Sequence, residues 1–236
     1  IIDITEAAWP EAYLYRTGRP LGQPFGLVAE GFYQNTEEIS NGPVVEGYSP
    51  QPGDLKYKDL NGDHIINALD KTALTSGKPV VNYGLNYGFQ WKGFDISMLW
   101  QGVMNVYTFT NSMNTLGFQI YQSGYSQAFE SNLGRWTPET AATATFPRIT
   151  LGYNTNNYQN SSFWLKRSDY LRLKYAEIGY ALPATDINRI KLKQARVFVN
   201  ATNLLTVSKF RNWDPEYSDW AYPNQRTVSA GVNIQF

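Results

Sequence analysis

Residues 82–103 read NYGLNYGFQWKGFDISMLWQGV, and their side chains alternate in character with a period of two. Because successive side chains of a β-strand point to opposite faces, this period predicts strands rather than a helix. One face of the first predicted strand, 82–91, is aromatic and aliphatic: Tyr83, Leu85, Tyr87, Phe89 and Trp91. The other face is small and polar: Asn82, Gly84, Asn86, Gly88 and Gln90.

The next strand, 94–103, repeats the pattern. Its apolar face carries Phe94, Ile96, Met98 and Trp100, and its polar face carries Asp95, Ser97 and Gln101 together with the apolar Leu99 and Val103. Only Lys92 and Gly93 separate the two strands, which predicts a two-residue hairpin turn. Such a turn places Trp91 opposite Phe94, so the two apolar faces coincide.

Composition narrows the class of protein. The chain has 236 residues, with 20 basic and 20 acidic residues and no cysteine. The balanced charge gives no reason to expect a nucleic acid partner. No run of 18 apolar residues is present, so we expect no transmembrane helix. Without cysteine, and with His64 as the only histidine, catalytic triads and zinc sites have little material, and we expect no enzyme.

Three further strands are predicted, at 170–180, 195–207 and 227–236. The last alternates most cleanly, with Val228, Ala230, Val232, Ile234 and Phe236 on one face. In the first, Leu171, Leu173 and Tyr175 oppose Arg172, Lys174 and Ala176, but Glu177 and Ile178 then take the wrong faces. A β-bulge and a strand end at a water interface both explain that break, and the sequence leaves them open.

The remaining segments are predicted to be mostly irregular. Residues 1–81 are rich in proline, with a strand end expected at 13–15. One short helix is also expected there, capped by Asn67 with Asp70 at its N3 position, and with Gly77 just past its end. Residues 104–168 form a long polar stretch that includes an ordered loop at 134–149. We therefore divide the chain into a loop region, 1–81, and a region of strands with long loops, 82–236.

Two architectures compete for these strands. An aromatic face opposite a polar one suits a wall with lipid outside and water inside, and short turns alternating with long loops suit a transmembrane β-barrel. The alternative is a secreted β-sandwich module that binds carbohydrate and is stabilised by calcium. An open sheet cannot span lipid, so a barrel would need more strands than this chain supplies. The chain also begins Ile1-Ile2-Asp3, so we expect it to be part of something longer.

Several blocks, in consistent order, resemble the C-terminal part of the SusC/RagA-type TonB-dependent outer-membrane transporters. They are GRPLGQPFGLVAEGFYQN (18–35), PGDLKYKDLNGDHIINALDKTAL (52–74), NYGLNYGFQWKGFDISMLWQG (82–102), GRWTPE (134–139), SDYLRLKYAEIGYALP (168–183), RVFVNATNLLTVSKF (196–210), DPE (214–216) and the strand that ends at Phe236. Together these blocks cover nearly the whole chain.

The resemblance implies the C-terminal strands of a barrel of about 22 strands in the outer membrane of a Gram-negative bacterium, with long extracellular loops. Such transporters import oligosaccharides or peptides. The implied partners are a SusD-like surface lipoprotein, the plug and remaining barrel, TonB through a region N-terminal to this chain, and outer-membrane lipid. Neither plug nor TonB box lies in these 236 residues, and Phe236 would be the aromatic end that barrel assembly reads.

A calcium loop is a candidate at 59–70. Oxygen ligands follow EF-hand spacing, with the backbone carbonyl of Ile65 completing the set: Asp59, Asn61, Asp63, Ile65, Asn67 and Asp70. His64 replaces the usual glycine and Asp70 the usual glutamate. The alternative is a loop of Asx-turns that leads into a helix cap.

Two further groups of side chains have open roles. Aromatic residues of the predicted loops could stack on sugars, meet a partner or simply pack: Trp136, Trp213, Tyr217, Trp220 and Tyr222. Arg172 and Lys174 are expected to face the lumen, as part of a substrate path or as solvated wall.

Overall fold

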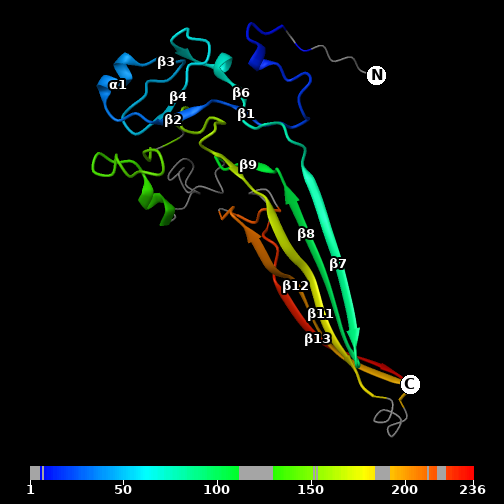
Figure 1. Ribbon diagram of the computed structural model, residues 1–236. Helices are drawn as coiled ribbons and strands as arrows, with labels where there is room; N and C mark the ends of the chain where they lie inside the picture. Colours follow the sequence, from blue (N-terminus) through cyan, green and yellow to red (C-terminus); the bar gives the residue numbers. More distant parts are fainter. Residues whose placement is uncertain are drawn as a thin grey trace. The chain divides into compact units, whose positions relative to one another are not determined.

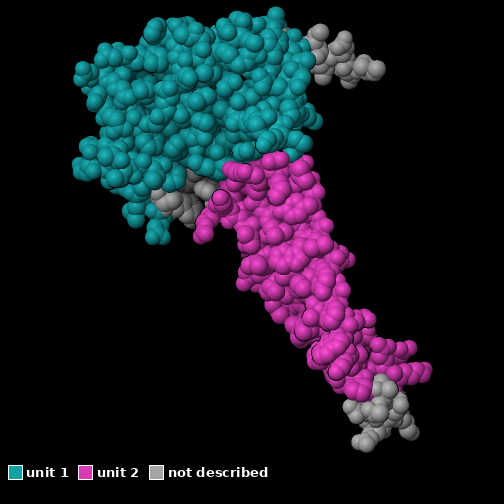
Figure 2. All heavy atoms as spheres, in the orientation of Figure 1, with its two compact units in different colours: residues 1–79, 107–166 teal, residues 80–106, 167–236 magenta. Residues whose placement is uncertain are grey.

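The computed structural model describes residues 6, 8–111, 130–150, 152, 154–183, 192–211, 213–216 and 222–236. The chain forms two compact units. Unit 1 comprises residues 1–79 and 107–166, and unit 2 comprises residues 80–106 and 167–236 (Figure 2). The described residues of the polar stretch that follows the second long strand are thus grouped with the N-terminal region. Antiparallel strands dominate, which confirms the all-β prediction. The described strands do not close into a barrel, so a barrel of about 22 strands stays a prediction.

Unit 2 is a single antiparallel sheet of five long strands in the order β13-β12-β11-β8-β7 (Figure 1). The strands are β7 (Val81–Trp91), β8 (Phe94–Met104), β11 (Tyr170–Ala181), β12 (Gln194–Ser208) and β13 (Thr227–Gln235). All five predicted strands are present, to within one residue at every end. Among the described residues, β7 and β13 each pair on one side only, so the sheet has two open edges.

The hairpin between β7 and β8 has the predicted geometry. Lys92 and Gly93 both have positive φ angles, 47° and 85°. Positive φ at both central positions is the requirement of a type I′ turn, whose twist matches that of the strands. Trp91 pairs with Phe94, and the register continues without a shift to Val81 and Met104. The aromatic faces of the two strands therefore coincide.

A bulge in β11 resolves the broken alternation of the sequence. Leu173 pairs with Trp100 and Tyr175 pairs with Leu99, so Lys174 is an extra residue relative to β8. Beyond it, Ile178 pairs with Ile96 on the apolar face and Glu177 with Ser97 on the polar face. The assignment of Tyr175 to the apolar face and Ala176 to the polar face was wrong, because the inserted residue exchanges the two faces from that point onward.

The next strand, β12, has one more extra residue at the level of the bulge. Between the same two levels of the sheet, β12 runs from Thr202 to Leu205, one residue more than β11. Asn203 takes a left-handed conformation there, with φ 51°, and its side-chain amide donates to the Gln225 carbonyl at 2.9 Å. Asparagine tolerates this conformation better than most residues. The extra backbone thus grows stepwise across three neighbouring strands.

Unit 1 consists of short elements joined by long connections. Its strands form two-residue to four-residue pairs, β1 with β6, β2 with β4, β3 with β5, and β9 with β10, whose last residue lies in unit 2. The strands are β1 (Phe25–Gly26), β2 (Ala29–Phe32), β3 (Val44–Val45), β4 (Leu55–Tyr57), β5 (Ile65–Ile66), β6 (Thr72–Ala73), β9 (Tyr107–Phe109) and β10 (Leu165–Arg167). The helices are η1 (Ala12–Leu14), α1 (Thr36–Asn41), η2 (Ala68–Asp70) and η3 (Glu130–Gly134).

The helices of unit 1 correct the sequence-based prediction. Residues 13–15 do not end a strand, because η1 forms there. The helix expected to reach Gly77 is the single turn η2: Asn67 and Asp70 form the expected capping box, but Thr72–Ala73 pairs as a strand with Phe25–Gly26 and stops the helix. Helix α1, capped by Asn35, was not predicted.

The core of unit 1 joins residues that are far apart in the chain. Its buried members are Leu27, Val45, Leu55, Tyr57, Ile66, Tyr158 and Trp164. The polar atoms of its aromatic rings find partners, since the Trp164 indole donates to the Asn157 carbonyl at 2.6 Å and the Tyr57 hydroxyl to the Asn156 carbonyl at 2.7 Å. Buried aromatic residues usually need such a partner. In the part of the chain that is described, no helix is long and apolar enough to cross a membrane.

Candidate functional site

The apolar face of the unit 2 sheet is exposed. Tyr87 and Phe89 each keep 50% of their surface accessible, and Val232 keeps 61%. The described residues of unit 2 form no second sheet that covers these side chains. A β-sandwich would bury such a face against its partner sheet. An apolar exposed face of this extent marks a surface that meets another apolar partner.

The opposite face of the sheet carries charge that is paired across strands. Arg196 of β12 donates to both carboxylate oxygens of Asp95 on β8, and its Nη2 lies 2.7 Å from Glu177 Oε1 on β11. The guanidinium lies over Gly179, where any Cβ would come within 2.2 Å of Arg196 Nη2. A side chain at position 179 would therefore displace the guanidinium from the place where it now crosses β11. Tyr175 and Asn200 also bond to Glu177.

A second charged group anchors the segment 213–216 to the same sheet. Arg172 is only 2% exposed, with Nη2 2.6 Å from Asp214 Oδ1 and Nη1 2.6 Å from Glu216 Oε2. Lys174, the bulge residue, reaches Glu216 at 3.0 Å. Burial opposes ionisation of Asp214, but the Glu216 N–H and the Arg172 guanidinium outweigh it and lower the Asp214 pKa. Arg172 is thus buried and paired with this loop. That Arg172 and Lys174 face a lumen, in a substrate path or as solvated wall, stays a prediction.

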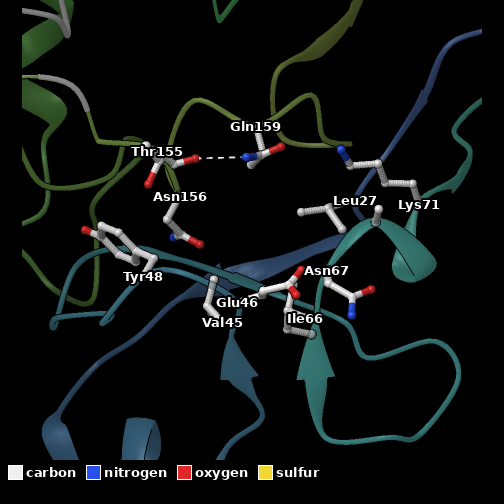
Figure 3. A pocket seen from close by; sticks show the side chains of 11 residues that line it. Leu27, Val45, Glu46, Tyr48, Ile66, Asn67, Lys71, Thr155, Asn156 and Gln159 are labelled. Atoms are coloured by element: carbon white, nitrogen blue, oxygen red, sulfur yellow. Dashed lines mark hydrogen bonds between the residues drawn. The ribbon is translucent and has the colours of Figure 1, made fainter.

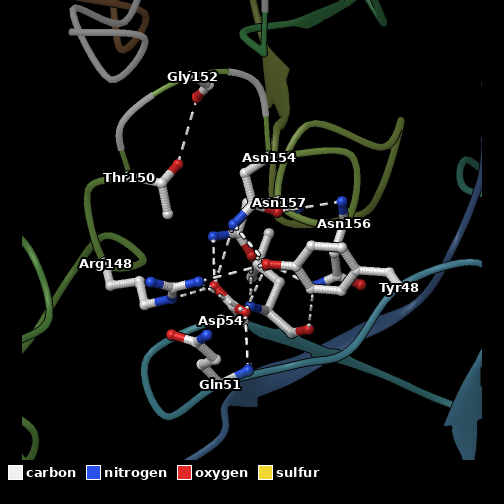
Figure 4. Close-up of polar contacts among 10 residues, drawn as sticks. Tyr48, Gln51, Asp54, Arg148, Thr150, Gly152, Asn154, Asn156 and Asn157 are labelled. Atoms are coloured by element: carbon white, nitrogen blue, oxygen red, sulfur yellow. Dashed lines mark hydrogen bonds and ion pairs between the residues drawn. The ribbon is translucent and has the colours of Figure 1, made fainter. Parts of the chain in front are cut away.

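A buried carboxylate organises unit 1 (Figure 4). Asp54 is completely buried and accepts from Arg148 Nε at 2.6 Å, Asn157 Nδ2 at 3.0 Å and the Tyr48 hydroxyl at 2.8 Å. Further donors are Asn154 Nδ2, Arg148 Nη2 and the Gln51 N–H. Burial and the adjacent Asp54 raise the pKa of Tyr48, so this phenol stays protonated and donates.

This network joins two segments that are about a hundred residues apart. It fastens the turn at 154–157 beside β4, where Asn157 Oδ1 accepts from the Leu55 N–H at 2.8 Å. Sequence reasoning did not single out the network, although Asp54 lies in the block 52–74 and Arg148 lies in the ordered loop 134–149. Only the proximity of these segments in the fold makes their side chains a unit.

A pocket of about 240 Å³ lies next to this network (Figure 3). Four segments of unit 1 line it: Leu27; Val45, Glu46 and Tyr48; Ile66, Asn67, Ala68 and Lys71; and Thr155, Asn156 and Gln159. Leu27, Val45 and Ile66 give it an apolar floor, while amide and charged side chains supply its polar groups. Of these, only Asn67 was among the predicted site residues.

The predicted calcium ligands lie in one loop and on η2, but their oxygens already serve the backbone. Asp59 accepts from the N–H groups of Gly62 and His64 at 2.7 and 2.8 Å, and Asp63 accepts from that of Ile65. The buried Asp70 accepts from the N–H groups of Leu60 and Asn67. Asn61 Oδ1 accepts from the Asp63 N–H, Asn67 Oδ1 from the Leu69 N–H, and Ile65 lies on β5.

His64 has a φ angle of 62°, the left-handed conformation that an EF-hand loop needs at that position. No group of three or more His, Cys, Asp or Glu residues within the described ranges is arranged to hold a metal ion. Calcium binding by this loop stays a prediction, beside the alternative of Asx-turns leading into a cap.

The aromatic loop residues separate into two kinds. Trp136 is buried and packs over Gly53, where any Cβ would approach its ring to 2.4 Å, so it serves packing. Tyr222 is 78% exposed and Trp213 is partly buried. Tyr217 and Trp220 lie outside the described residues.

Unit 2 therefore defines a class of protein: a wall of antiparallel strands with one face exposed and apolar, the other charged and polar, and both edges open among the described residues. Comparison with known proteins places the chain within this class. It is 30% identical to a TonB-dependent receptor of Formosa agariphila over 227 residues, which cover 89% of the chain and 22% of that protein. It is 22% identical to the TonB-dependent receptor SusC of Bacteroides thetaiotaomicron over 217 residues, 89% of the chain and 20% of that protein.

Solved structures give the same fold. The RagAB peptide importer in its open-open state matches with a TM-score of 0.65 and 21% identity, over 100% of this chain and 24% of that one. A second structure, of the RagAB peptide transporter, matches with a TM-score of 0.61 and 20% identity, over 90% of the chain and 22% of that one. No protein-family model matches the sequence. The predicted resemblance to SusC/RagA-type TonB-dependent receptors is confirmed, and the chain spans about a fifth to a quarter of the length of these relatives.

Proposed function

We propose that this chain supplies C-terminal strands of the barrel of a TonB-dependent nutrient importer in the outer membrane of a Gram-negative bacterium. The exposed apolar face of the unit 2 sheet carries the proposal, because an apolar surface of five strands needs an apolar medium and lipid is one. The open edges of β7 and β13 are the second support. Strand edges in lipid must be paired, so further strands would complete a barrel of about 22.

The partners belong to the same proposal. A plug and upstream strands would fill and close the barrel, TonB would couple it to the energy of the inner membrane, and a SusD-like lipoprotein would cover its outer side, where unit 1 would form extracellular loops. Relatives named as receptors and as a peptide importer support transport rather than catalysis. Oligosaccharides and peptides are both retained as cargo.

Paired cysteine substitutions test the orientation of the wall. The chain has no cysteine, so within it single sites can be labelled without background. Leu85 and Asn86 are neighbours on β7 with opposite faces. In intact outer membranes we expect a small membrane-impermeant maleimide to label Asn86→Cys through the aqueous lumen and to leave Leu85→Cys unlabelled. Equal labelling of the two sites, or labelling of Leu85→Cys alone, would contradict the proposal.

Heat-modifiable migration is a second test that distinguishes the barrel from the sandwich. A closed barrel resists unfolding in cold SDS, so the detergent-extracted whole protein should migrate faster unheated than boiled. A β-sandwich should purify without detergent and should show its apolar faces protected from solvent. Copurification of a surface lipoprotein with the extracted protein, and its loss on removal of that gene, tests the partner separately.

A further inference from the structure

Two arginine side chains of unit 1 share one aromatic ring. The guanidinium carbons of Arg16 and Arg19 lie 4.6 and 5.5 Å from the centroid of the Phe25 ring. The negative face of the ring attracts each guanidinium and holds it in place. Neither guanidinium has an ion-pair partner among the described residues. Two positive charges are therefore held close together without a counter-ion from the described part of the chain.

A third cation adjoins this pair. Gly77 packs against Pro20, since a Cβ at Gly77 would lie 3.4 Å from Pro20 Cδ. Arg19 precedes Pro20 and Lys78 follows Gly77, so the two basic residues flank one contact. Lys78 is exposed and also has no ion-pair partner in the described ranges. We call Arg16, Arg19 and Lys78 the basic cluster.

Strand pairing ties the basic cluster to the segment that leads into the sheet of unit 2. Phe25 of β1 pairs with Ala73 of β6, and the Leu74 N–H donates to the Pro24 carbonyl at 2.9 Å (Figure 1). The chain then runs through Lys78 directly into β7, which begins at Val81.

The residues that follow Lys78 begin the apolar wall. Val80 and Val81 are both exposed and apolar. If the wall faces lipid, as proposed above, residues just beyond its apolar rows lie at the level of the lipid headgroups. Long basic side chains at that level extend toward anionic headgroups.

The turn that carries the two arginines already binds one anion. The Glu6 carboxylate accepts from the N–H groups of Arg16 and Thr17, both at 2.8 Å, and from the Thr17 hydroxyl at 2.6 Å. Successive backbone N–H groups that point at one anion are a recurrent anion-binding device. Arg19 uses only its Nε in the described structure, which donates to the Tyr15 carbonyl at 2.7 Å. The Nη groups of both arginines therefore remain for a second anion.

A phosphate group suits the basic cluster better than a carboxylate does. Its terminal oxygens accept several N–H donors, and it carries up to two negative charges, whereas guanidinium groups match its geometry in bidentate pairs. We propose that the basic cluster binds the phosphate group of a membrane lipid headgroup, with Arg16 and Arg19 as donors and Lys78 as a further positive charge. The choice of a lipid as the source of the phosphate rests on the proposed function, whereas binding of a phosphate group does not.

The guanidinium groups can be removed without disturbing the contact with Glu6. Arg16→Gln combined with Arg19→Gln removes both charges and keeps the backbone N–H that binds the Glu6 carboxylate. Lys58 is exposed and Arg135 is partly buried, and both lie in unit 1 outside the basic cluster. Lys58→Gln combined with Arg135→Gln removes the same net charge and is the matched control.

Equilibrium binding to the whole protein in uncharged detergent micelles tests the proposal. The probes are a glucosamine lipid with one phosphomonoester, its dephosphorylated counterpart and inorganic phosphate. Each basic residue near an anionic lipid surface contributes roughly a fivefold factor in affinity, so the phosphorylated lipid should bind the double variant about thirtyfold more weakly than the native protein. The control should bind it as the native protein does. Unchanged exchange of the Leu74 amide verifies that β1 and β6 remain paired in both variants.

Three results would overturn parts of this proposal. Equal binding of the phosphorylated lipid to the native protein and the double variant, or an equal loss in the control, removes the basic cluster as a site. Equal binding of the lipid with and without its phosphate shows that phosphate is not recognised. Inorganic phosphate that binds as tightly as the lipid makes free phosphate the ligand. Binding in micelles requires neither a closed barrel nor transport, whereas cysteine labelling of β7 tests the wall, so the two proposals fail separately.

Discussion

The two units differ in the interactions that stabilise each of them. In unit 2, the information is local: alternation along each strand and a two-residue turn fix the register, and the large apolar side chains remain on the outside. In unit 1, short strands contribute little by themselves, and buried polar contacts between residues 48–57 and 148–158 hold the fold. The sheet therefore depends on its surroundings to cover it, whereas unit 1 carries its own core.

The largest expected effect breaks the polar centre of unit 1. Asp54→Ala removes the carboxylate and leaves Arg148, Asn154 and Asn157 with unmatched donors. Removing one partner of a buried ion pair costs about 3–5 kcal/mol of folding free energy. Hydrogen exchange should show lost protection of residues 48–57 and 148–158 while the strands of unit 2 remain protected.

The control for Asp54 is the partly exposed pair of Glu38 and Lys56, at 2.8 Å. Exposed pairs contribute about 0–1 kcal/mol. Glu38→Gln should therefore leave the same protection almost unchanged. Equal losses in Asp54→Ala and Glu38→Gln would show that the buried network does not hold unit 1 together.

The next effect breaks the sheet from its apolar side. Tyr87 and Asn86 are neighbours at the middle of β7 but face opposite ways. Arginine on a lipid-facing site near the bilayer centre costs about 2–4 kcal/mol, falling toward the interfaces. We expect Tyr87→Arg to reduce the folded fraction in phospholipid vesicles, measured by heat-modifiable migration, and Asn86→Arg to be tolerated. Greater harm from Asn86→Arg would reverse the assignment of faces.

A third prediction concerns calcium binding by the loop 59–70 of unit 1. If the loop 59–70 binds Ca²⁺, the ion at a hundred times its dissociation constant stabilises the folded state by about 2.7 kcal/mol. EDTA should then lower the melting temperature of the protein, and Asp59→Asn should weaken that response. A melting temperature that is the same in EDTA and in calcium leaves the Asx-turn loop as the whole explanation.

The smallest effect concerns the N-terminal end of unit 1 and depends on pH. Glu6 accepts from the Thr17 hydroxyl at 2.6 Å and from the Arg16 and Thr17 N–H groups at 2.8 Å. The Thr17 hydroxyl, with these N–H groups, lowers the Glu6 pKa from 4.5 to about 2.

Because the pKa of Glu6 is lower in the folded chain than in the unfolded chain, the ionised carboxylate stabilises the folded N-terminal segment. This stabilisation is complete above pH 4.5 and is lost as the pH falls toward 2. Exchange of the Arg16 and Thr17 amides, corrected for the intrinsic pH dependence, should accelerate in that window. Glu6→Gln should remove the pH dependence. Equal pH profiles in the native protein and in Glu6→Gln would contradict the assignment.

The strands were predictable from sequence because their evidence is periodic. Tyr83 to Trp91 repeat one rule over a whole strand, and Lys92-Gly93 satisfies a turn of known geometry. The bulge was harder to predict, since Glu177 only signals that the alternation has failed. The extra residue is Lys174, because its neighbours Leu173 and Tyr175 pair with the adjacent residues Trp100 and Leu99 of β8.

The candidate sites of unit 1 lay beyond such reasoning. Asp54 and Arg148 are 94 residues apart, and no local pattern relates them. Asn156 is one of several asparagines in a polar stretch, and only the fold distinguishes the one whose buried oxygen has no partner among the described residues. The capping box of Asn67 and Asp70 was predictable because its two members are three residues apart, but the pairing of Thr72 that shortens the helix was not.

Stepwise lengthening of neighbouring strands has a consequence for the form of the wall. Between the same two levels, β8 advances one residue, β11 two and β12 three. Each added residue contributes up to about 3.3 Å of backbone. An inserted residue bends its strand and increases the local twist, and bends of this kind are how a sheet gains the curvature that rolling into a tube requires.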